Sequence, residues 1–179
     1  YEVIEVKVNE WSEPITFNAK CKEGEFEGVT LLKGTSEGLY IAPAVYFNSQ
    51  WANDEELMRD VWENVVKKVG AFLDADHHGL QKGIIGFEDF LQTAEFAFKF
   101  FTTYTGYLLK KYNWDFAIAY LPIIDNMQHL LFGLGEDYEK YVLWAYQKAD
   151  EFIGQISDLA DVLFIASDHG IAKVTKRVY

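Results

Sequence analysis

Two short segments of the sequence each place an aspartate and a histidine directly after a run of apolar residues. In AYLPIIDNMQHLLFG the pair is Asp125 and His129, and in VLFIASDHG it is Asp168 and His169. Carboxylate and imidazole groups together form ligand sets that suit zinc, manganese or iron better than calcium. The four side chains are therefore candidate metal ligands.

The spacing within each pair decides whether its two side chains can meet. If Asp125 begins a helical turn, His129 returns to nearly the same face of the helix four positions later. Asp168 and His169 are adjacent, so they converge only if the chain turns there, and Gly170 gives the backbone that freedom. Structural explanations exist too, since Asp125 could cap a helix and His129 could be an ordinary buried histidine. Two such pairs at equivalent places favour the metal interpretation.

Buried strands are expected immediately before both pairs. DFAIAYLPII (residues 115–124) and DVLFIAS (residues 161–167) are apolar without polar alternation, which is typical of strands covered on both faces. Between them, residues 135–160 predict a helix. Strand, helix and strand in this order form a βαβ unit, so we expect a parallel sheet. Ligand sites of such sheets form beyond the carboxyl ends of the strands, where both pairs lie.

The first half of the chain has a different pattern. Short alternating runs such as YEVIEVKV, PITFNAK and GLYIAPAVYF predict a small antiparallel sheet or hairpins. Helices are expected over residues 54–69 and from Phe87 to Tyr112, the second with phenylalanines that pack a core. We therefore predict an α/β fold in which a β-rich insert or cap with one helix, residues 1–86, precedes a partial metal-binding α/β domain, residues 87–179.

A loop between the two predicted helices holds a second group of candidate ligands, Asp74, Asp76, His77 and His78. The glycines and charges around DADHH favour a solvated surface loop. Contact with a substrate from this loop is the alternative.

Composition limits the partners of the chain. Its 179 residues include 28 acidic and 16 basic ones, a formal net charge of -12. Such a charge opposes binding to a nucleic-acid duplex or an anionic membrane, and a phosphate-ester or nucleotide-like substrate would need local cations. The single cysteine, Cys21, cannot form an internal disulfide, so we expect a reducing, cytoplasmic setting. No stretch is long enough to span a bilayer.

Three segments in order, DFAIAYLPIIDNMQH, YEKYVLWAYQKADEFIGQI and FIASDHG, resemble the type I phosphodiesterase/nucleotide pyrophosphatase family of the alkaline phosphatase superfamily. The resemblance implies an alkaline phosphatase-like parallel-sheet domain and a metal-dependent phosphohydrolase with two divalent cations. By this resemblance Asp125 and His129 would bind one ion, and Asp168 and His169 the other. We expect zinc in preference to manganese or iron.

The resemblance leaves two parts of the family's site outside the chain. The nucleophile, a Thr or Ser beside a further metal-binding Asp, would precede Tyr1, and a last His ligand would follow Tyr179. The chain begins with Tyr rather than Met, so we expect a segment of a longer protein. We predict that the polypeptide alone binds metal weakly and hydrolyses nothing. The alternatives are a phosphomutase or sulfatase of the same superfamily, or a non-catalytic binding domain.

Overall fold

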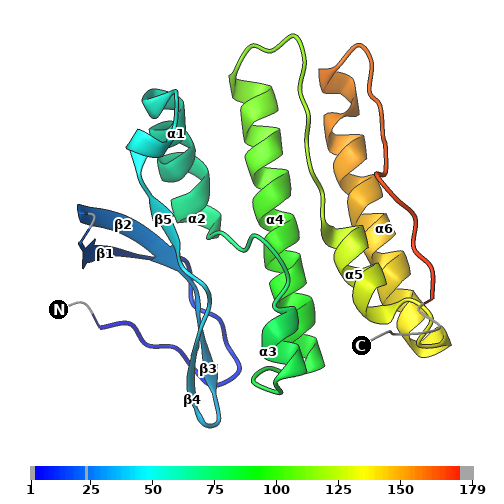
Figure 1. Cartoon of the computed structure of the whole chain (residues 1–179), viewed down its shortest axis with the longest axis horizontal. Coiled ribbons are helices and arrows are strands. Elements are labelled where there is room, and N and C mark those ends of the chain that lie inside the picture. Colours follow the sequence, from blue (N-terminus) through cyan, green and yellow to red (C-terminus); the bar gives the residue numbers. More distant parts are fainter. Residues whose placement is uncertain (1–2, 23, 174–179) are drawn as a thin grey trace. The chain divides into compact units, whose positions relative to one another are not determined.

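The computed structural model describes residues 3–22 and 24–173 and forms two compact units, Tyr1–Leu73 and Asp74–Tyr179. Within the described residues, all the strands lie in the first unit, and the second is built from helices and extended segments (Figure 1). The chain is therefore a mixed α/β structure, as predicted, with small antiparallel sheets.

The two units divide between Leu73 and Asp74, whereas the residue pattern predicts a boundary after residue 86. The difference is the DADHH loop with its short helix α3 (His77–Gln81), which belongs to the second unit. The Asp76 backbone N–H of this loop donates a hydrogen bond to Thr93 Oγ1 in the second unit, at 3.0 Å.

Two antiparallel sheets form the β part of the first unit. The larger has the strand order β1-β2-β5 and the smaller is a β3-β4 hairpin. Their bounds are β1 (Ile15–Cys21), β2 (Gly24–Thr30), β3 (Leu32–Thr35), β4 (Gly38–Ile41) and β5 (Val45–Phe47). The expected antiparallel hairpins are thus confirmed, but the first alternating run is not a strand in its described part, where only Val8 pairs, with Gly34.

The helix predicted over residues 54–69 forms and contacts β2 and β5 of the larger sheet. It follows the short 3-10 turn η1 (Ser49–Trp51) and consists of α1 (Glu55–Val61), the π-helical turn η2 (Trp62–Val66) and α2 (Lys67–Val69). Asp54 caps it by accepting a hydrogen bond from the Leu57 N–H at 2.9 Å. The buried Trp62 stacks on Phe47 of β5, with ring centroids 5.3 Å apart.

Three helices pack together in the second unit (Figure 1). They are α4 (Phe87–Lys111), α5 (Ile123–Leu131) and α6 (Glu136–Ile156), which continues into the 3-10 turn η3 (Ser157–Leu159). The long aromatic helix and the helix after residue 135 are confirmed. Their buried side chains include Phe90, Ala94 and Ala97 of α4, Ile123 and Met127 of α5, and Ala145 and Phe152 of α6. Along the described part of the chain, no helix combines the length and apolar composition needed to cross a bilayer.

The two segments expected to be buried parallel strands are not strands in this structure. Residues 115–121 and 162–167 join no ladder among the described residues, and their backbones run unpaired beside the helices. Phe116 and Phe164 are 79% and 87% exposed. A strand needs a neighbour to satisfy its N–H and C=O groups, and the described residues provide none.

Candidate metal centre

Asp125 and His129 meet because the chain becomes helical before the aspartate. Pro122 has a φ of -79° and precedes the first residue of α5, so Asp125 lies in the first turn. A negative charge is favourable there because it faces the positive end of the helix dipole. His129 follows one turn later, and its Nε2 lies 3.3 Å from Asp125 Oδ1. The expected convergence at four-residue spacing is therefore confirmed.

His169 reaches the same place from the far end of the chain. Its Nε2 lies 3.8 Å from Asp125 Oδ1, and its ring centroid is 6.3 Å from that of His129. One ligand atom from each of Asp125, His129 and His169 lies within 4.8 Å of the other two. Three of the four predicted ligands thus gather at one point, on the surface of the second unit.

Asp168 lies beside this group without joining it. Its side chain is 91% exposed, and its Oδ1 is 3.7 Å from His169 Nε2. The expected approach of Asp168 and His169 is therefore present, and the structure in addition brings His169 to Asp125 and His129. A turn in the backbone holds His169 in this position, since the Ser167 hydroxyl donates to the His169 carbonyl oxygen and His169 Nδ1 lies 3.0 Å from the Gly170 carbonyl oxygen.

Tyr120 lies in a negative electrostatic field beside the cluster, and the sequence pattern did not predict this. Partial burial raises the pKa of the Tyr120 hydroxyl, and the charges of Asp125, Asp74 and Asp168 raise it further. The three carboxylates therefore act on one region although they come from three separate segments. Such a field attracts cations. The only signal in the sequence was that Tyr120 is the last aromatic residue before Asp125.

The DADHH loop has mainly structural contacts. Asp76 caps α3 by accepting a hydrogen bond from the Gly79 N–H at 2.8 Å. His77 packs against the buried Phe90, with ring centroids 5.0 Å apart. Across residues 3–22 and 24–173, the cluster at Asp125 is the only group of three or more acidic, histidine or cysteine residues with ligand atoms this close together.

A family model for type I phosphodiesterase / nucleotide pyrophosphatase matches residues 7–179. The chain belongs to this family. No curated protein and no solved structure matched the chain. The family consists of hydrolases of phosphodiester and pyrophosphate bonds that generally depend on divalent metal ions. The match begins at residue 7, before β1. It therefore includes the β-rich first unit in addition to the two motif segments.

Proposed function

We propose that this chain carries part of the metal centre of a metal-dependent phosphodiesterase or nucleotide pyrophosphatase, which hydrolyses phosphate esters with two divalent cations. The convergence of Asp125, His129 and His169 in a member of the family is the observation that carries the proposal. Two motif segments, separated in the chain by α6, supply these three side chains.

The donor atoms fit a divalent transition metal. One carboxylate oxygen and two imidazole nitrogens form a set that zinc accepts readily, and that manganese or iron also accepts. Three protein ligands leave a coordination position open, as catalytic zinc sites require. All three side chains are partly exposed, so a substrate can reach them. A bound divalent cation would polarise a phosphoryl oxygen and offset the charge that develops on it.

Each residue has a separate part in this proposal. Asp125 supplies the negative charge of the cluster, and His129 and His169 supply neutral donors. The Gly170 carbonyl lies next to Nδ1 of His169, so it favours the tautomer that leaves Nε2 free to bind metal. Asp168, beside His169, would serve the second cation. The nucleophile has no assigned residue in this chain.

Zinc titration tests the proposal directly. We expect the polypeptide to bind zinc in isothermal titration calorimetry, and Asp125→Asn, His129→Gln and His169→Gln each to weaken binding at least tenfold, as loss of one ligand should. His78→Gln is the matched control, because His78 is exposed and lies outside the cluster. Circular dichroism shows whether each variant is folded. Equal zinc affinity in all four variants would overturn the proposal.

A hydrolysis assay tests whether the polypeptide alone lacks the catalytic nucleophile. With a chromogenic phosphodiester and zinc or manganese, we expect the polypeptide alone to show no turnover, since no nucleophile is assigned within it. Turnover that disappears in the Asp168→Ala variant would show instead that the chain contains its own catalytic groups.

A further inference from the structure

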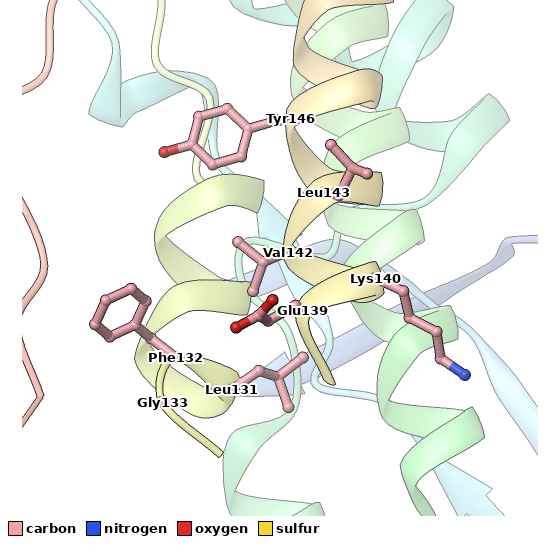
Figure 2. Close-up of a pocket in the computed structure, with 8 residues that line it drawn as sticks. All are labelled: Leu131, Phe132, Gly133, Glu139, Lys140, Val142, Leu143 and Tyr146. Atoms are coloured by element: carbon pink, nitrogen blue, oxygen red, sulfur yellow. The ribbon is translucent and has the colours of Figure 1, made fainter. Parts of the chain in front are cut away.

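A groove lies between the end of α5 and the first half of α6 (Figure 2). Its volume is about 490 Å³, within the range of small-molecule sites, roughly 300–1,000 Å³. The apolar side chains that line it are Leu131, Phe132, Val142, Leu143 and Tyr146. Several of them are open to solvent, and Leu143 is 59% exposed.

The groove begins just beyond the metal cluster along α5. Phe132 follows His129 by three residues, less than one helical turn, which corresponds to a rise of about 4.5 Å. Directly before His129, the Gln128 side-chain amide donates a hydrogen bond to the Tyr146 hydroxyl at 3.0 Å. Tyr146 is therefore tied to the same turn of α5 that presents His129.

The segment that carries His169 also passes from the cluster to the groove. Lys173 follows His169 by four residues, and its side chain lies against Gly133. A Cβ added to Gly133 would be 3.3 Å from the Lys173 side chain. Gly133 lines the groove and has a φ of +79°, a conformation that favours glycine. Both chain segments that supply the cluster thus reach the groove.

The charges at the groove do not single out a second phosphate. The Glu139 carboxylate lies among the apolar lining residues, whereas Lys140 extends away from them (Figure 2). The Lys173 side chain lies against Gly133, so a cation as well as a carboxylate borders the groove. An uncharged, apolar group would instead bury surface against Phe132, Leu143 and Tyr146.

We propose that this groove is the subsite for the organic group of the phosphate ester, and that it takes an uncharged aryl or alkyl group. The phosphate would lie at the cluster of Asp125, His129 and His169, so the inference rests on the proposed function. Phe132, Leu143 and Tyr146 are then specificity-determining residues. The favoured substrates are esters of apolar alcohols or phenols.

Binding of two non-hydrolysable ligands to the zinc-loaded protein tests this inference. Phenylphosphonate and methylphosphonate share the group that would bind the cation and differ in the group that would enter the groove. We expect phenylphosphonate to bind about tenfold more tightly, because part of one aromatic ring leaves water. In the Leu143→Ser and Tyr146→Ser variants the preference should fall to about threefold or less, and zinc affinity should be unchanged in Leu143→Ser. Leu73→Ser is the matched control, since Leu73 is also 59% exposed and does not line the groove.

The outcomes separate this inference from the metal proposal. If zinc and both phosphonates bind with no preference for the phenyl group, the groove assignment is overturned and the metal centre stands. A preference that persists in both groove variants also overturns it, because the ring then binds elsewhere. A chain that binds no zinc overturns both proposals.

Discussion

The carboxylate of Asp125 lies 3.8 Å from the imidazole of His169, although the whole of α6 separates the two residues in the chain. This contact joins the D-x-x-x-H and S-D-H-G motifs into one site. It forms without a sheet between the two segments, because α5 begins directly after Pro122 and the backbone turns between Ser167 and Gly170. The geometry of the cluster therefore depends on a helix start and a turn.

Zinc affinity should fall as the solution becomes acidic. An imidazole must lose its proton before it binds a metal, so protons compete with zinc at His129 and His169. Calorimetric titration in a series of buffers measures how steeply the zinc affinity falls as the pH decreases. The His169→Gln variant should have a shallower slope, and an identical slope would contradict a role for His169 as a ligand.

The Tyr120 hydroxyl should titrate above the ordinary tyrosine value of 10.0. Partial burial is the larger cause, and the carboxylates of Asp125, Asp74 and Asp168 add to it because they disfavour the phenolate. NMR of labelled tyrosine rings would follow the titration, with Tyr120→Phe to assign the signal. Asp125→Asn should lower the pKa of Tyr120, and zinc should lower it too. A titration that responds to neither change would show that the cluster does not act on Tyr120.

In the first unit, Glu27 should contribute stability that is lost in acid. Hydrogen bonds from Lys67 at 2.9 Å and from the Trp62 indole hold the pKa of Glu27 below its usual 4.5. Hydrogen bonds from Lys67 to Glu27, and to a smaller extent to Glu63, raise the pKa of Lys67 above its usual 10.5. Because the folded pKa of Glu27 is lowered, its contribution is present above about pH 5 and disappears as the pH falls through the folded value. The Lys67 contribution is present below its unfolded pKa and is lost only in strong alkali.

Denaturant unfolding of Glu27→Gln measures this contribution. At neutral pH we expect a loss of roughly 1–2 kcal/mol, because the Lys67 ammonium and the Trp62 N–H lose their charged acceptor. The difference from the original protein should shrink at about pH 3, where Glu27 is protonated. Lys20→Gln is a control, since its ion pair with Glu25 is fully on the surface. A difference that is constant from acid to neutral pH would contradict the role of the ionised carboxylate.

The two unpaired apolar segments should make the chain self-associate. Residues 116–120 and 162–165 expose most of their large apolar side chains, and contiguous exposed apolar surface drives association. Replacing Ile118 and Phe164 by Thr should reduce both the binding of a hydrophobic dye and the association seen in sedimentation velocity. Stability should change by less than about 0.5 kcal/mol, as for other surface substitutions. Val3→Thr is the control, because Val3 is an exposed apolar residue outside both segments.

The buried Asn126 should cost stability in this chain. It is 6% exposed, and its Nδ2 has no hydrogen-bond partner among the described residues. A buried donor without a partner destabilises by about 1–3 kcal/mol. Asn126→Leu should therefore raise the midpoint of thermal unfolding while leaving zinc affinity unchanged. A lower midpoint would show that the amide makes a stabilising contact in solution.

Local patterns determined the helices and the small hairpins of this protein. The helix over residues 54–69 has Asp54 as its cap and apolar residues at helical spacing, and both signals act within a few residues. The same is true of Asp125 and His129, whose convergence follows from one helical turn. Helix caps and contacts within one helical turn can be predicted because the interacting groups are neighbours in sequence.

Only the tertiary structure decided which pairs became one site and which apolar runs stayed unpaired. Residues 115–121 and 162–167 have the composition of buried strands, yet a strand forms only beside another strand, and apolar composition does not say where that partner is. For the same reason, the spacing of residues did not predict that His169, which also lies beside Asp168, would join Asp125 and His129. Contacts between distant segments depend on how whole helices and turns pack, which residue spacing does not record.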